Sequence, residues 1–168
     1  MENKRVQSLT RIAIMASIQS VVFLIFSQVL YLEGITFVVC LFACAFEKDE
    51  AVFASFIFGV VNMLLQGATI WTMMYILIYP SYSFIVGNWK YTLLNKPMLL
   101  VALCGVLSFL TGQLLELPFL LFSTKATIFY LVMGLKTSLI QGCLSAILCL
   151  LLFDPCYDVL KKIEGRLK

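Results

Sequence analysis

Residues 127–153 read TIFYLVMGLKTSLIQGCLSAILCLLLF and carry a single charged side chain, that of Lys136. A helix needs about 20 residues to cross the hydrocarbon core of a bilayer, so this run predicts a membrane-spanning helix. A charged group near the centre of such a helix costs about 2.5–3.5 kcal/mol on insertion scales and usually faces a cavity or a partner. Lys136 therefore marks a candidate binding site, together with Glu116 near the same end of the preceding apolar run.

Further apolar runs precede this one in a chain of 168 residues that is 62% hydrophobic and 12% charged. An ordinary soluble domain carries about 25% charged residues. We therefore predict an all-α, six-transmembrane-helix integral membrane protein that forms one domain over residues 1–168. The expected spans are 11–30, 35–46, 51–65, 70–86, 98–122 and 127–153.

Three of these spans have features that affect their ends. The first runs on to Leu30, which favours an uncleaved span over a signal peptide. The short runs 35–46 and 51–65 are separated by a charged turn, which predicts a helical hairpin with room to extend into the flanking loops. Pro80 should kink the helix predicted over 70–86 or end it early.

The distribution of Lys and Arg predicts that both termini face the cytoplasm, because basic residues favour the cytoplasmic flanks of membrane spans. In this topology only Lys125 and Lys136 of the 12 basic residues lie toward the outside. The remaining ten are Lys4, Arg5, Arg11, Lys48, Lys90, Lys96, Lys161, Lys162, Arg166 and Lys168.

The outer half of this topology collects the aromatic and polar residues that a small-molecule pocket needs. Its loops are expected at 31–34, 66–69 and 123–127. Glu116 is a candidate partner for Lys136. The candidate substrate-binding residues are Glu33, Trp71, Tyr75, Glu116, Lys125, Tyr130, Lys136 and Gln141.

Each candidate also has a purely structural interpretation. Trp71 and Tyr75 fit an aromatic belt at the membrane interface as well as they fit a pocket wall. Glu33 and Lys125 fit solvated loop charges. Lys136 could extend its long side chain toward the interface instead of into a pocket.

Small residues form a stripe in the first span, at Ala13, Ala16, Ser17 and Ser20. The pairs Ala13/Ser17 and Ala16/Ser20 each share one face of a helix, and small residues let helices approach closely in lipid. The stripe is therefore a candidate docking surface for a partner helix. Packing within the same chain is the alternative.

Nothing in the sequence supports an enzyme. It has no histidine, no paired CxxC motif and no phosphate-binding P-loop, so we expect no catalytic residue, no metal site and no cofactor. We also see no basic patch typical of nucleic-acid binding, no repeated halves typical of carriers and no polar rings typical of channels. The six cysteines are expected to be small buried hydrophobes. They are Cys40, Cys44, Cys104, Cys143, Cys149 and Cys156.

Four segments together resemble the substrate-binding S components of energy-coupling-factor (ECF) vitamin transporters. The resemblance implies a six-helix fold in the prokaryotic plasma membrane that binds a water-soluble vitamin or precursor near the outer surface. It also implies docking, through the stripe at 13–20, onto a transmembrane coupling subunit driven by two cytoplasmic ATPases, with toppling of the S component to carry its ligand inward. The segments are LTRIAIMASIQ (9–19), EKDEAVFASFIFGVVNMLLQG (47–67), TIWTMMYILIYPSYSFIVG (69–87) and GLKTSLIQGCLSAILCLLLFDPCYDVLKK (134–162).

Within that family, the pattern W-T-x-x-Y-x-x-x-x-P at 71–80 resembles the hydroxymethylpyrimidine/pyridoxine-type group. The histidine-bearing pocket of the thiamine branch and the first loop of the riboflavin branch, rich in Pro and Asp, have no counterpart here. Pantothenate, whose carboxylate could pair with Lys125 or Lys136, and cobalamin are further candidates. The alternatives from other classes are a self-sufficient secondary carrier or facilitator and an assembly factor without a ligand.

Overall fold

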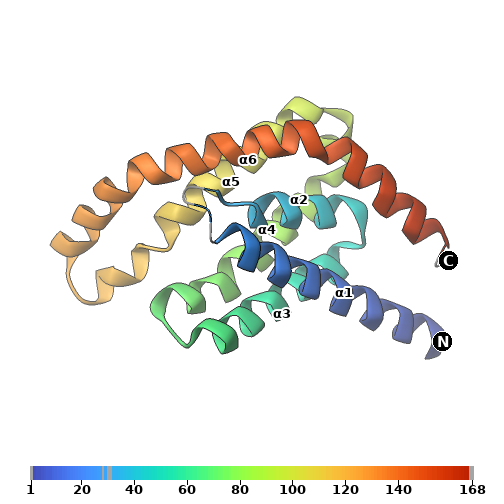
Figure 1. The fold of residues 1–168 in the computed structure, drawn as a ribbon, viewed down its shortest axis with the longest axis horizontal. Coiled ribbons are helices and arrows are strands. Elements are labelled where there is room, and N and C mark those ends of the chain that lie inside the picture. Colours follow the sequence, from blue (N-terminus) through green and yellow to red (C-terminus); the bar gives the residue numbers. More distant parts are fainter. Residues whose placement is uncertain (1, 28, 30–31, 167–168) are drawn as a thin grey trace.

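The computed structural model describes residues 2–27, 29 and 32–166, and the side chains of 5–27, 29 and 32–165. The expected end of the first span at Leu30, Tyr31 of the first outer loop, and the side chains of Lys4, Arg166 and Lys168 lie outside this description. The described residues are helical with short connections and contain no strand, which confirms the all-α class (Figure 1). The elements are α1 (Glu2–Phe26), α2 (Ile35–Ala45), α3 (Lys48–Gln66), α4 (Ile70–Asn95), α5 (Pro97–Leu114), the 3₁₀ helix η1 (Leu117–Leu121) and α6 (Thr124–Arg166).

Most of these helices are those of a multi-pass membrane protein. Helix α2 is the exception, because its 11 residues extend about 16 Å at about 1.5 Å per residue, roughly half of the hydrocarbon core. Five segments among the described residues are long and apolar enough to cross a membrane: Arg5–Phe26, Lys48–Gln66, Ile70–Asn95, Pro97–Leu121 and Thr124–Gly165.

Several helices extend beyond the spans expected from the sequence. Helix α3 begins inside the charged turn, so that Asp49 and Glu50 occupy its first turn, where the helix dipole favours acidic side chains. Helix α4 continues through Pro80 to Asn95, so an early end at Pro80, one of its two expected effects, is wrong. It ends before Pro97, since a proline disfavours helical geometry in the residue that precedes it.

The centre of the fold is α2, whose residues are all buried. It contacts α1, α3, α4, α5 and α6. A helix that is apolar on every side is expected in an interior position, which is where the run 35–45 lies.

The cysteines follow the expected pattern in part. All six are free, and four of them are buried as predicted. Cys156 is partly buried, whereas Cys143 is exposed on α6, so the prediction is wrong for Cys143. The four buried ones are Cys40, Cys44, Cys104 and Cys149.

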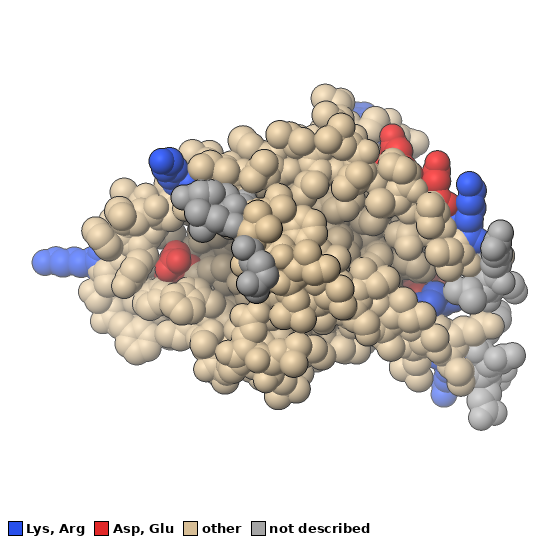
Figure 2. Space-filling view, in the orientation of Figure 1, with Lys and Arg blue, Asp and Glu red and all other residues tan. Residues whose placement is uncertain are grey.

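Both chain ends lie at the same end of the molecule, on the right in Figure 1, which we call the terminal end. The α3–α4 connection and the segment from α5 to α6 lie at the opposite, distal end. Figure 2 shows that charged side chains gather at the terminal end and are few at the distal end, where an acidic side chain is visible in a hollow.

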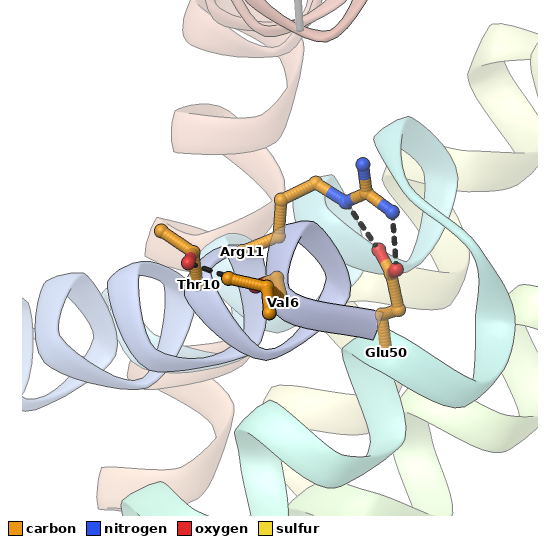
Figure 3. Close-up of polar contacts among 4 residues, drawn as sticks. All are labelled: Val6, Thr10, Arg11 and Glu50. Atoms are coloured by element: carbon orange, nitrogen blue, oxygen red, sulfur yellow. Dashed lines mark hydrogen bonds and ion pairs between the residues drawn. The ribbon is translucent and has the colours of Figure 1, made fainter. Parts of the chain in front are cut away.

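An ion pair joins α1 to α3 in the half of the molecule that holds the chain ends (Figure 3). The guanidinium of Arg11 donates from Nε to Glu50 Oε2 (2.9 Å) and from its terminal nitrogen to Oε1 (2.5 Å). The two side chains are only 16% and 6% exposed. A two-pronged contact of this kind fixes geometry as well as charge, so Arg11 and Glu50 hold the two helices in register.

Candidate functional site

Two adjoining cavities lie toward the distal end. The first has a volume of about 280 Å³ and lies among the end of α1, the segment before α2, and α4, α5 and α6. The second, of about 520 Å³, lies among the end of α3, the start of α4, the end of α5, and α6. They share the lining residues Tyr75, Gly112, Leu115, Thr137 and Gln141.

The first cavity exists because residues 32–34 enter the interior without forming a helix. Non-helical backbone at membrane depth is tolerated where it is enclosed by protein or lines a water-filled cavity, and Leu32, Glu33 and Gly34 all line this one. Gly34 is required by close packing, since a Cβ atom there would lie 2.8 Å from the ring of Phe26. Because α2 is short, space remains beyond its N-terminal end that a full-length helix would fill.

Glu33 lies at the floor of this cavity, with its carboxylate bonded to the protein. Its Oε1 accepts hydrogen bonds from Thr36 N (3.0 Å), Thr36 Oγ1 (2.8 Å) and Tyr79 OH (3.3 Å). Its Oε2 accepts from Ser108 Oγ (2.7 Å), and Ser145 Oγ donates to the Glu33 carbonyl oxygen (2.6 Å) while lying 3.3 Å from Oε2. Glu33 therefore ties α2, α4, α5 and α6 together and is not a solvated loop charge.

Five side chains of the second cavity differ from Glu33, because they lack hydrogen-bond partners among the described residues. Glu116 Oε2 is out of reach of solvent and accepts no hydrogen bond from the described residues. The side chains of Trp71, Tyr75, Thr137 and Gln141 also make no hydrogen bond to the described part of the chain, although all four line this cavity. Buried polar groups normally find a partner, so the side chains of Trp71, Tyr75, Thr137 and Gln141 are available to a ligand or to water.

Aromatic rings form one wall of the cavities. Tyr75 packs against Phe23 and Tyr79, with ring centroids 5.6 Å and 5.4 Å apart. Trp71 packs against Phe119 at 5.9 Å and is 46% exposed. Both Trp71 and Tyr75 line the second cavity, which favours the pocket over the interfacial belt for these two residues.

Three residues expected at the pocket line neither cavity: Lys125, Tyr130 and Lys136. The ring of Tyr130 packs against that of Phe119, with centroids 5.1 Å apart, and is exposed. Lys125 is exposed in the first turn of α6. This placement corrects the prediction that these three side chains line the pocket.

The expected pairing of Glu116 with Lys136 is also wrong, because the structure contains no such ion pair among its described side chains. The residues of α6 that face the second cavity are 134, 137, 138 and 141. These share one helical face, and Lys136 points away from it and is exposed. Helix α6 has 43 residues, about 64 Å, so it projects beyond the hydrocarbon core and need not bury this charge.

The small-residue stripe of α1 divides between two faces. Ala16 is buried, with 3% of its surface exposed, and packs within the chain. Ala13 and Ser17 are exposed, whereas Ser20 is partly buried. Internal packing therefore accounts for Ala16, and the Ala13/Ser17 pair is the part of the stripe that remains open.

The sequence interpretation missed several residues that build the site: Thr36, Tyr79, Ser108, Thr137 and Ser145. Ser108 and Ser145 are polar positions inside long apolar runs, a signal that these side chains meet a partner in the interior. No group of three or more His, Cys, Asp or Glu side chains among the described residues is placed to hold a metal ion.

Comparisons with known protein families, with curated proteins and with solved structures find no match for this chain.

Proposed function

We propose that this chain is the substrate-capture (S) subunit of an ECF-type ABC importer in a prokaryotic plasma membrane. With six spans and both termini in the cytoplasm, the distal end faces outward and presents the two cavities to the extracellular side. The main support is that polar side chains without partners line these cavities, while buried α2 and the Arg11–Glu50 pair close the interior toward the terminal end. A site accessible from one side suits capture of a solute better than it suits a channel.

A small ring-shaped vitamin or precursor is the proposed ligand, with hydroxymethylpyrimidine or pyridoxine as the best candidates. Cavities of about 280 and 520 Å³ fall near the volume range of ordinary small-molecule sites. Aromatic rings offer stacking surfaces, and Gln141 and Glu116 offer directional polar groups. Pantothenate loses the support of Lys125 and Lys136, which line neither cavity, and cobalamin would require a wider site.

Delivery would depend on partners, because the sequence contains no nucleotide-binding P-loop. The proposed partners are a transmembrane coupling subunit and two cytoplasmic ATPases, on which the chain topples to carry the ligand inward. Helix α1 supports this arrangement, since only 17% of the apolar stretch within its candidate span, Arg5–Phe26, is buried inside the protein. Such a face is covered either by lipid or by another helix.

Binding and transport should separate in a reconstitution experiment. We expect the chain alone, purified in detergent, to bind one small vitamin or precursor with nanomolar-range Kd in calorimetry. Liposomes should take up that compound only when they contain the coupling subunit and ATPases. Gradient-driven uptake by the chain alone would support a secondary carrier instead. The capture proposal fails if no compound binds from a panel of pyridoxine, hydroxymethylpyrimidine, pantothenate, cobalamin, folate and queuosine precursors.

Docking through α1 predicts that Ser17→Trp blocks association with the coupling subunit and leaves ligand affinity unchanged. The indole would occupy the open face between Ala13 and the partner helix, where close approach needs small residues. Co-purification with the coupling subunit measures association, and calorimetry measures affinity. Val106→Trp, an equally drastic change at an exposed position of α5, serves as the control and should still associate. Normal association of Ser17→Trp would contradict docking through this face.

A further inference from the structure

The cavities carry acidic side chains and no basic ones among the described residues that line them. Glu33 lines the first and Glu116 lines the second. The nearest expected cations in the sequence, Lys125 and Lys136, lie elsewhere, and neither forms an ion pair in the described structure. The site therefore offers carboxyl groups and no cation among its described lining residues.

Glu116 is the group with unused binding capacity. It lies in the turn between α5 and η1, where its backbone N–H donates to Gln113 O (3.2 Å) and its carbonyl oxygen accepts from Phe119 N (3.2 Å). The backbone is thus satisfied, while no described residue donates to the carboxylate, which lines the second cavity and has its Oε2 buried without a partner. Removing a carboxylate oxygen from water without supplying a donor is costly, so a ligand group that donates to it is favoured.

Glu33 also favours a cationic ligand, although its own carboxylate oxygens already accept hydrogen bonds from the protein. All donors to its carboxylate are neutral: the Thr36 amide and the hydroxyls of Thr36, Tyr79 and Ser108. These bonds hold the carboxylate in place but supply no positive charge. A cation bound in the adjoining cavity would stabilise the charged form of Glu33, whereas a bound anion would not.

The remaining lining groups suit a planar cation equally well. The rings of Trp71, Tyr75 and Tyr79 offer faces that attract cations as well as stacking area. The free amide of Gln141 and the free hydroxyl of Thr137 can accept hydrogen bonds from a donor on the ligand. None of these groups supplies the positive charge that would hold a carboxylate or a phosphate.

We infer that the ligand of these cavities is a planar organic cation whose N–H groups donate to Glu116, and that anions are rejected. This inference rests on the proposed function and narrows its substrate class. It favours ligands such as an aminopyrimidine or an amine-bearing pyridine over any vitamin that carries a carboxylate.

Benzamidine and benzoate test the charge preference directly, because they are planar molecules of similar shape and opposite charge. With the full chain in nanodiscs and empty nanodiscs as background, we expect ligand-observed NMR titration to show benzamidine binding at least tenfold more tightly than benzoate. Glu116→Gln should weaken benzamidine about tenfold and should not weaken benzoate. This variant should fold normally, since the Glu116 side chain makes no hydrogen bond to the described residues.

Asp158→Asn is the matched control, because it removes the same charge from an exposed position of α6 in its C-terminal part and should leave both affinities unchanged. The inference is overturned if benzoate binds as tightly as benzamidine, if benzamidine does not bind, or if both variants lose affinity equally. An anionic vitamin bound with nanomolar-range Kd would overturn it and leave the capture proposal standing. Binding of benzamidine with no binding of any vitamin would refute the capture proposal alone.

Discussion

Replacing Glu33 with alanine is expected to lower the free energy of unfolding of the protein by about 3–5 kcal/mol. The change leaves four donors without their acceptor: Thr36 N, Thr36 Oγ1, Tyr79 OH and Ser108 Oγ. Each orphaned buried donor costs about 1–3 kcal/mol, and water from the adjoining cavity offsets part of the total. The midpoint of thermal unfolding in detergent should fall by roughly 10 °C.

Two controls separate the hydrogen bonds of Glu33 from its charge. Tyr79→Phe removes only the longest of these bonds, 3.3 Å, and should cost about 1 kcal/mol. Glu33→Gln keeps an acceptor for Thr36, and the hydroxyls of Ser108 and Ser145 can rotate to accept from the new amide, so it should lie between alanine and the wild type. A Glu33→Ala variant that unfolds at the wild-type temperature would show that the carboxylate does not hold the helices together.

The depth of Glu33 illustrates what the sequence could and could not predict. Hydropathy correctly indicated six helical runs and a membrane protein, because apolar length alone decides that question. It placed Glu33 in an outer loop, since residues 31–34 separate two apolar runs. The run 35–46 was too short to span a bilayer, and only the folded structure shows that non-helical residues 32–34 continue it into the interior at its N-terminal end.

The error at Lys136 has a different physical cause. The sequence indicated that a charge interrupts an apolar run, but the face on which it lies depends on how α6 rotates against α5. Gly105 and Gly142 set that rotation, because a Cβ at either would lie within 3.0 Å of the other's backbone oxygen. This close approach turns residues 134, 137, 138 and 141 toward the cavity and turns Lys136 away. Trp71, Tyr75 and Gln141 line the cavities because their helical positions face inward, and Glu116 lines the second cavity from the turn after α5.

Replacing only one member of the Arg11–Glu50 pair is expected to cause the second large loss of stability. Arg11→Met leaves the Glu50 carboxylate, which is 6% exposed, without its cation and both donors. Removing one partner of a buried pair typically costs about 3–5 kcal/mol, and the partial exposure of Arg11 places the expected loss near the lower limit. From the sequence alone Arg11 indicates only orientation, whereas in the folded chain it also fixes α1 against α3.

The double variant Arg11→Met/Glu50→Met is expected to recover most of that loss, because replacing both members of a buried pair by apolar residues is often neutral or stabilising. Thermal unfolding of the wild type, both single variants and the double variant forms a cycle that isolates the interaction between the two side chains. Lys161→Met, which removes the 2.8 Å pair with Glu164, provides a control at a more exposed site and should change stability by less than about 1 kcal/mol. If the two single losses simply add in the double variant, Arg11 and Glu50 stabilise the protein independently and the pair does not fix α1. Since α1 carries the proposed docking face, a coupled result would also mean that the register of this face depends on Glu50 of α3.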